Sequence, residues 1–144
     1  MKIVIQDPSP GEGDQIILKV KALSEPMLKA LQLLKSPDDL PVFIDGKAYM
    51  LPIEDIFYVE SMELKTFVYS EKDCYRSRLK LYELEETLGA EHFLRISKQV
   101  IVHIKKIKSI SPAGGGRFQG LLTNGEKVII SRQYVSALKA RFGL

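Results

Sequence analysis

Short stretches of alternating hydrophobic and polar residues make up most of the chain beyond residue 41, which is typical of β-strands. They predict strands at 42–45, 47–51, 56–61, 66–70 and 74–79, and later at 117–123 and 126–130. Asp45-Gly46 and Asn124-Gly125 are dipeptides that favour tight hairpin turns, so each is expected to join the two strands that flank it. The pattern therefore predicts a chiefly β fold built from antiparallel pairs.

Helical spacing of apolar residues occurs in three places. The first follows Ser24, a suitable N-cap, and should stop at Ser36-Pro37. The second covers 81–88 and stops at Gly89, and the third follows Ser131 as its N-cap. Residues 93–110 are less regular and are interpreted as a strand to Ile96, a turn or short helix over 97–103 and a strand from 105 to 110.

The first 41 residues differ from the rest of the chain. Apolar runs at 2–6 and 15–22 flank a loop of turn-forming residues and predict two short strands ahead of the first helix. Residues 36–41 contain two prolines and two aspartates, which is typical of a linker. We therefore expect a β-β-α extension over 1–41, with a dimerisation or regulatory role, and a separate domain over 42–144.

Length and composition narrow the class of protein. A chain of 144 residues that is 45% hydrophobic can build one core with a small appendage. The single cysteine, Cys74, excludes an intrachain disulfide and is expected to be a small buried side chain. No apolar run approaches the ~20 residues that span a bilayer, and no secretory signal is evident. These features predict a cytoplasmic protein.

The charges are distributed unevenly, although the net charge is only +3. Residues 1–91 hold 11 Lys and Arg against 17 Asp and Glu, whereas residues 92–144 hold 10 against the single acid Glu126. No carboxylate occurs between His92 and Gly125. A polyanion is the natural partner of such a region, and the acidic part should then face away from it.

Catalysis is not predicted, because the residues that could perform it do not form a motif. The chain has one cysteine and two histidines, and it lacks HExxH, GxSxG and paired CxxC sequences. Gly114–Gly116 precedes a strand rather than a helix, so it indicates a turn and not a phosphate loop. We expect no catalytic residue, cofactor, metal or small-molecule substrate.

Three segments offer chemistry suited to DNA. Arg132 falls in the first turn of the last helix, where its charge opposes the helix dipole but could grip a phosphate or a guanine edge. Ser97 and Lys98 follow an apolar strand in an irregular stretch, and loop 62–65 lies between two strands, although its Glu63 would repel phosphate. RNA binding is disfavoured because exposed aromatics do not interleave with the basic residues.

The order of these segments resembles the LytTR DNA-binding domain family over residues 42–144. The matching stretches are IEDIFYVES, KTFVYS, LYELEETLG, FLRISKQVIVHIKKIKSISP and GRFQGLLTNGEKVIISRQYVSALK. The resemblance implies an elongated, mainly β arrangement of small antiparallel sheets with short helices, whose loops enter major grooves of double-stranded DNA. It implies these contact residues: Lys65, Thr66, Ser97, Lys98, Gln99 and Arg132, with Arg95 and Lys105 as phosphate partners.

Two positions depart from the family pattern: His103 stands where Asn is common, and Gln99 where Ser or Thr is common. Residues 1–41 are too short for a receiver domain and look like the extension of stand-alone LytTR regulators. The resemblance therefore implies a homodimeric transcriptional regulator that is not controlled by phosphorylation, with a small membrane protein as a candidate partner. The alternative is a protein-interaction module that anchors to or regulates a membrane partner without specific DNA binding.

Overall fold

The structure of the chain is a computed structural model that describes residues 1–34 and 38–144. The chain divides into two compact units, residues 1–35 and 36–144. No helix in either described range is long and apolar enough to cross a membrane.

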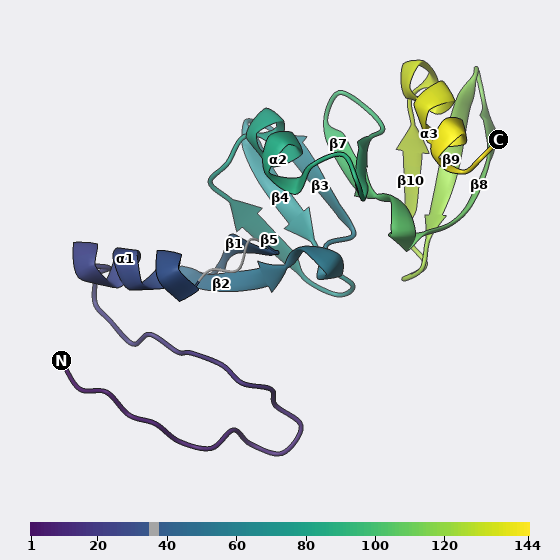
Figure 1. Cartoon of the computed structure of the whole chain (residues 1–144). Coiled ribbons are helices and arrows are strands. Elements are labelled where there is room, and N and C mark those ends of the chain that lie inside the picture. The colour runs from purple at the N-terminus through teal and green to yellow at the C-terminus, as the bar shows by residue number, and fades with distance from the viewer. Residues whose placement is uncertain (35–37) are drawn as a thin grey trace. The chain divides into compact units, whose positions relative to one another are not determined.

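The first unit contains a single helix in its described part, α1 (Glu25–Leu34), which begins with a hydrogen bond from Leu28 N to Ser24 O of 3.0 Å. The strands predicted at 2–6 and 15–22 are wrong, because neither segment forms one (Figure 1). Both segments are exposed along their whole length, and an isolated pair of strands without an apolar layer to cover it is marginal in water. The predicted helix is confirmed, whereas its predicted stop at Ser36-Pro37 lies outside the described residues.

The second unit is built on a seven-stranded antiparallel sheet with the strand order β2-β1-β5-β4-β3-β7-β6 (Figure 1). The strands are β1 (Asp39–Ile44), β2 (Lys47–Pro52), β3 (Tyr58–Met62), β4 (Lys65–Tyr69), β5 (Cys74–Ser77), β6 (Phe93–Arg95) and β7 (Val100–His103). Residues 39–41, which were expected to belong to a linker, are the beginning of β1; residues 36 and 37 of that linker lie outside the described part of the chain.

The turn between β1 and β2 is the tight hairpin turn that the sequence predicted. Asp45 has φ 48° and Gly46 has φ 76°, so both residues adopt the left-handed conformation of a two-residue turn. The strands on either side pair along their whole length, from Ile44 opposite Lys47 to Asp39 opposite Pro52.

The helix predicted over 81–88 is confirmed as α2 (Leu81–Leu88), and it packs on the larger sheet (Figure 1). Its leucines at positions 81, 84 and 88 are buried in a core with Val59 and Val68 of the sheet. Lys80 N donates to Glu83 Oε1 over 3.1 Å and so satisfies one free amide at the start of the helix.

A smaller antiparallel sheet with the order β10-β9-β8 completes the unit. Its strands are β8 (Ile107–Gly114), β9 (Arg117–Leu122) and β10 (Lys127–Ile130), and it is followed by the 3-10 turn η3 (Arg132–Tyr134) and the helix α3 (Val135–Arg141). Two further 3-10 turns are η1 (Ile53–Asp55) and η2 (Ile104–Lys106). Val102 of β7 shares one core with Ile130 and Leu138, so apolar contacts join the two sheets.

Two local predictions are corrected by the structure. Residues 100–103, expected as a turn or short helix, form β7, which lies between β3 and β6 in the sheet. Cys74, expected to be buried, is exposed, because in β5 the inward positions are Tyr75 and Ser77. Side chains alternate between the two faces of a strand, so a shift of one position reverses the prediction. The mainly β fold of antiparallel sheets with short helices is confirmed.

Candidate nucleic-acid interface

Two main-chain hydrogen bonds bring together three loops that lie far apart in the sequence. Ser61 N, at the end of β3, donates to Gln99 O over 2.8 Å, and Ser131 N, just before η3, donates to Ile96 O over 2.8 Å. The loop between β6 and β7 (96–99) is therefore fixed to the β3–β4 hairpin on one side and to the start of η3 on the other. We call the β3–β4 turn, residues 96–99 and residues 131–132 the three-loop surface.

A groove of about 710 Å³ runs between these loops and β10. Its lining includes Glu60, Met62, Ser97, Gln99, Lys127 and Ser131. Loop side chains of both sheets thus border one shared depression.

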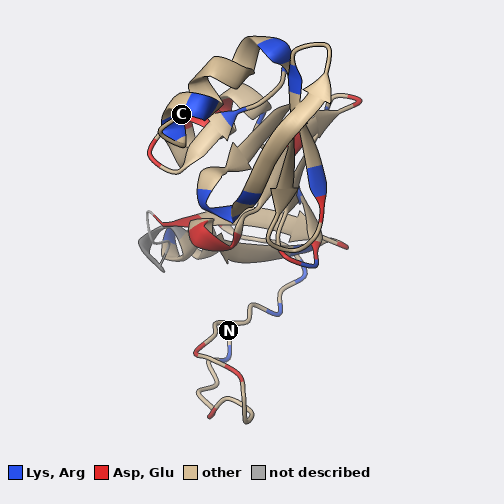
Figure 2. Ribbon diagram, turned by 90° about the vertical axis from the view of Figure 1, so that its right-hand side faces the viewer, with Lys and Arg blue, Asp and Glu red and all other residues tan. Residues whose placement is uncertain are grey.

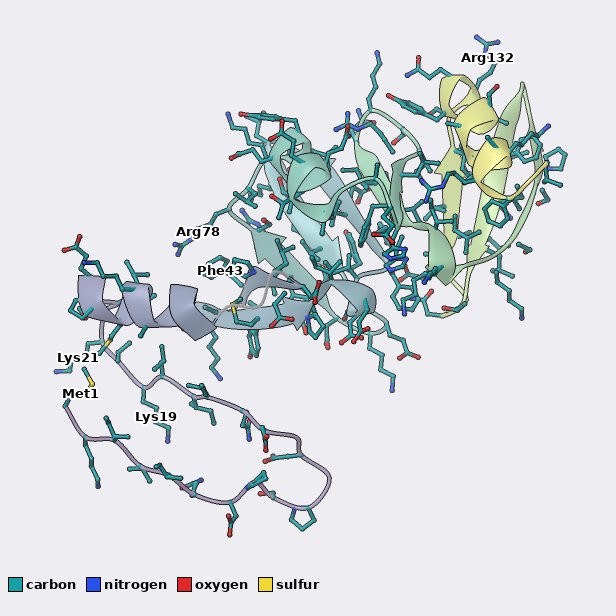
Figure 3. The ribbon with its side chains drawn as sticks, in the orientation of Figure 1. Met1, Lys19, Lys21, Phe43, Arg78 and Arg132 are labelled. Carbon is teal, nitrogen blue, oxygen red and sulfur yellow. The ribbon has the colours of Figure 1, made fainter. Side chains whose placement is uncertain are left out.

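The structure presents four of the predicted contact residues to solvent on or beside the three-loop surface. Lys65, Lys98, Gln99 and Arg132 are all exposed. Arg132 begins η3, and Figure 3 shows its side chain extending away from the ribbon ahead of α3. Thr66, by contrast, is only 6% exposed, so its hydroxyl is not offered to a ligand here.

Residues 96–99 form an ordered turn through their own hydrogen bonds. Ile96 N donates to Val100 O over 3.0 Å, and Gln99 N donates to Ser97 Oγ over 3.2 Å. The Ser97 hydroxyl is therefore engaged within the turn, whereas Lys98 stands at its tip. This arrangement reduces the conformational freedom that a bound ligand would otherwise have to restrict.

Arg95 lies behind the turn and contacts protein groups. Its Nε is 2.6 Å from Glu85 Oε2 on α2, and its Nη1 donates to Lys98 O over 3.3 Å. Only 26% of its side chain is exposed. The geometry fits a residue that positions the turn better than one that contacts phosphate directly.

The side chain of Arg132 is supported by the turn between β8 and β9. Gly116 has φ 79°, and a Cβ atom placed on it would come within 2.7 Å of Arg132 Cδ. The aliphatic part of Arg132 thus occupies space that only glycine leaves open, and Gly114–Gly116 forms a turn, as predicted.

Lys105 is not brought together with the other predicted residues. Lys98 precedes β7 and Lys105 follows it in η2, so the two lie at opposite ends of that strand. The amide of Lys105 donates to Nδ1 of His103 over 3.2 Å. Burial, followed by the positive charge of Lys106, lowers the pKa of His103 to about 4, so this imidazole is a neutral acceptor at pH 7.

Two acidic residues of the first 91 positions lie beside the three-loop surface, although the acidic part of the chain was expected to face away from a bound polyanion. Glu60 and Glu63 line the same groove as Ser97 and Gln99, and Figure 2 shows acidic segments interspersed with basic ones. The hydroxyl of Tyr69 donates to Glu60 Oε1 over 3.4 Å. Carboxylates and cations are therefore mixed here: Glu60, Glu63 and Lys127 all line the groove, and Lys98 and Arg132 stand on the loops beside it.

Leu64 is an exposed residue that sequence reasoning missed. Its exposure is 104%, and Met62 in the same hairpin is 49% exposed. The sequence did contain a feature that could have revealed it: two apolar residues, Met62 and Leu64, occur in loop 62–65, where a turn would ordinarily be polar.

Metal binding has no support in the described residues: across 1–34 and 38–144, no three His, Cys, Asp or Glu side chains gather as a metal site requires.

The fold and the three-loop surface define a class of protein: a mainly β domain that presents cationic loop tips from two joined sheets. The family model for the LytTr DNA-binding domain matches residues 46–143, and the chain belongs to this family. The family consists of DNA-binding regulator domains and not of enzymes, in agreement with the sequence prediction.

Several known proteins are similar to the chain. The sensory transduction protein LytT of Enterococcus faecalis is 29% identical over 140 residues, covering 94% of this chain and 58% of that protein. The transcriptional regulatory protein LytR of Staphylococcus aureus strain N315 is 30% identical over 105 residues, covering 73% of this chain and 43% of that protein. The chain thus spans about half the length of these relatives.

A solved structure supports the fold directly. It is described as the LytTr DNA-binding domain of a methyl-accepting/DNA response regulator from Bacillus cereus, and it matches with a TM-score of 0.70 at 26% sequence identity. The match covers 74% of this chain and 98% of that domain.

Proposed function

We propose that the chain is a sequence-specific transcriptional regulator that reads double-stranded DNA through the three-loop surface. The observation that supports this most is the pair of hydrogen bonds from Ser61 to Gln99 and from Ser131 to Ile96, because they hold three exposed loops in one fixed arrangement. Loops held on a rigid scaffold are suited to recognition. The chain belongs to the LytTR family of DNA-binding domains, which supports DNA as the ligand.

Lys98 and Arg132 have separate roles in this proposal. Arg132, exposed at the start of η3, can donate two hydrogen bonds to O6 and N7 of a guanine in the major groove. Lys98, at the tip of its turn, and Lys65, at the start of β4, carry mobile ammonium groups that suit phosphate oxygens. Binding should therefore weaken steeply with salt, while discrimination between sites depends on Arg132.

A homodimer is the second part of the proposal. Residues 1–31 expose apolar side chains such as Ile5, Ile17 and Leu28, which are 94%, 65% and 45% exposed. A second copy that covered these residues would join two three-loop surfaces in one particle, as a site made of paired half-sites requires. Sedimentation velocity of the full chain and of the variant Ile17→Asp tests it: a dimer that the variant dissociates supports the proposal, and a monomeric full chain contradicts it.

The DNA-binding proposal is tested by fluorescence anisotropy on a duplex recovered from a random library, with scrambled duplex beside it, across a salt series. Arg132→Ala should reduce the preference for the selected duplex by roughly 5- to 150-fold, the value of one bidentate base contact. Lys108→Ala is the matched control, because it removes one exposed positive charge from β8, the strand farthest from β10 in its sheet. An equal loss of this preference in both variants would show that Arg132 does not read a base.

The exposed apolar residues of the first unit also fit a different function, in which the chain anchors to or regulates a membrane partner without specific DNA binding. Crosslinking in cells followed by sequencing of the recovered DNA separates the two functions. Discrete sites favour the regulator, whereas uniform background together with membrane association of the chain favours the anchor.

A further inference from the structure

The tip of the β3–β4 hairpin carries an apolar side chain in full contact with solvent. Leu64 is 104% exposed, although leucine is among the residues most often buried. The hairpin closes with Met62 paired to Lys65, so Glu63 and Leu64 are its two turn residues. Leu64 therefore adds nothing to the buried core of the domain.

The backbone at this turn is also unfavourable for the residues it contains. Glu63 has φ 51° and Leu64 has φ 65°, both left-handed, a conformation in which the Cβ of a bulky residue meets the following carbonyl oxygen. The β1–β2 turn of the same chain places Asp45-Gly46 in this conformation, which is the favoured kind of pair. Unfavourable backbone conformations that persist are concentrated at functional sites.

The tip lies beside the cations of the three-loop surface. Ser61, in the same hairpin, is hydrogen-bonded to Gln99, which follows Lys98, and Lys65 is the first residue after the turn. A duplex drawn to these cations would also approach Leu64. A leucine side chain cannot bond to phosphate, and the one apolar group on the major-groove edge of the bases is the C5-methyl of thymine.

We propose that Leu64 is a specificity-determining residue that contacts a thymine C5-methyl group, an inference that rests on the proposed DNA-binding function. The contact would favour a T·A pair over a C·G pair at one position of the site. Glu63, the neighbouring turn residue, disfavours approach of the tip to phosphate, which leaves the base edges as the surface that Leu64 meets.

The test replaces each thymine of the selected duplex, one at a time, by deoxyuridine, which lacks only the C5-methyl group. For the full chain, at least one replacement should weaken binding about fourfold, the value of burying one methyl-sized group. In Leu64→Ala the ratio of the affinity for the thymine duplex to the affinity for that deoxyuridine duplex should fall to about one. The preference for the other base pairs of the site should be unchanged. Tyr82→Ala is the matched control, because it removes a side chain that is 61% exposed on α2.

The outcomes separate the inference from the function on which it rests. A full chain that recovers a site but binds every deoxyuridine duplex as tightly as the thymine duplex overturns the role of Leu64 alone. The same holds if Leu64→Ala keeps the ratio of the unmodified chain. Failure to recover any site overturns the DNA-binding function and the inference with it. Leu64→Asn removes the apolar side chain but tolerates the left-handed turn. If this variant also loses the ratio, a folding defect is not the cause.

Discussion

The aliphatic part of Arg132 rests on the backbone of Gly116: a Cβ atom at Gly116 would lie 2.7 Å from Arg132 Cδ and 3.0 Å from Cγ. The β8–β9 turn therefore determines where the guanidinium of Arg132 can reach. Gly116→Ala should displace Arg132 and lower the preference for the selected duplex, measured by anisotropy, by several-fold.

Gly115→Ala provides the control for this prediction. Gly115 also has a left-handed φ, 64°, so alanine strains the backbone at both positions, but its nearest neighbour is Arg117 Nε at 3.9 Å. Both variants should lose similar thermal stability, and only Gly116→Ala should lose discrimination. A loss of discrimination in both would mean that turn strain, and not contact with Arg132, is responsible.

Lys98 and Lys105 should differ in their effect on salt dependence. Lys98 belongs to the three-loop surface, whereas Lys105 lies beyond the other end of β7. Each phosphate contact contributes about −0.9 to the slope of log K against log salt concentration. Lys98→Ala should reduce the slope by about that amount and Lys105→Ala should leave it unchanged. If only Lys105→Ala reduced the slope, the phosphate contact would have to be assigned to η2 and not to the three-loop surface.

The ion pair between Arg95 and Glu85 should stabilise the turn that carries Lys98. We expect Arg95→Ala and Glu85→Ala each to lower the free energy of unfolding in urea. The double variant should lose less than the sum of the two, by about 0.5–1 kcal/mol, because the pair is partly exposed. Additive losses would show that the pair contributes nothing measurable.

His103 should make the domain less stable in acid. Its pKa is lowered to about 4 in the folded chain, chiefly by burial, against about 6.5 in an unfolded chain. The unfolded chain then binds more protons between these values, so the stabilisation is complete above pH 6.5 and is lost as the pH falls to 4, by roughly 3 kcal/mol at most.

His103→Asn tests this directly, because the amide oxygen of asparagine can still accept from Lys105 N but does not titrate. The free energy of unfolding of this variant should vary less between pH 6.5 and pH 4 than that of the unmodified chain. His92→Asn, at the neighbouring ring 5.9 Å away, should reduce the dependence far less, because burial and Lys106 contribute more than His92 to the lowered pKa of His103. An unchanged dependence in His103→Asn would assign the acid sensitivity to other groups.

Local sequence patterns were sufficient to predict most helices, strands and turns of the second unit. The Asp45-Gly46 turn and the helix over 81–88 follow from short-range chemistry, and both are confirmed. Strand β7 was missed because its four residues stand between Lys98-Gln99 and Lys105-Lys106, and its identity as a strand depends on pairing with β3 and β6. Pairing partners are not encoded in a local pattern.

The candidate site was predictable by segment but not by side chain. Resemblance indicated all three loops, yet it could not show that Thr66 faces inward while Leu64, two positions earlier, faces solvent. It also could not show that Glu85 holds Arg95, since that contact joins α2 to β6 across an intervening loop. Burial and long-range contacts decide such details, and only the folded chain contains them.

The hydrogen bonds that join the three loops use main-chain atoms of Ser61, Gln99, Ile96 and Ser131. Every residue except proline carries the same donor and acceptor, so the side chains at the loop tips can change while the frame that holds them persists. Under the proposed function, substitutions at positions 64 and 132 would therefore alter the preferred target one position at a time, without a new fold. Related chains that share this main-chain frame could therefore evolve preferences for different DNA sequences by changing only the side chains on the loops.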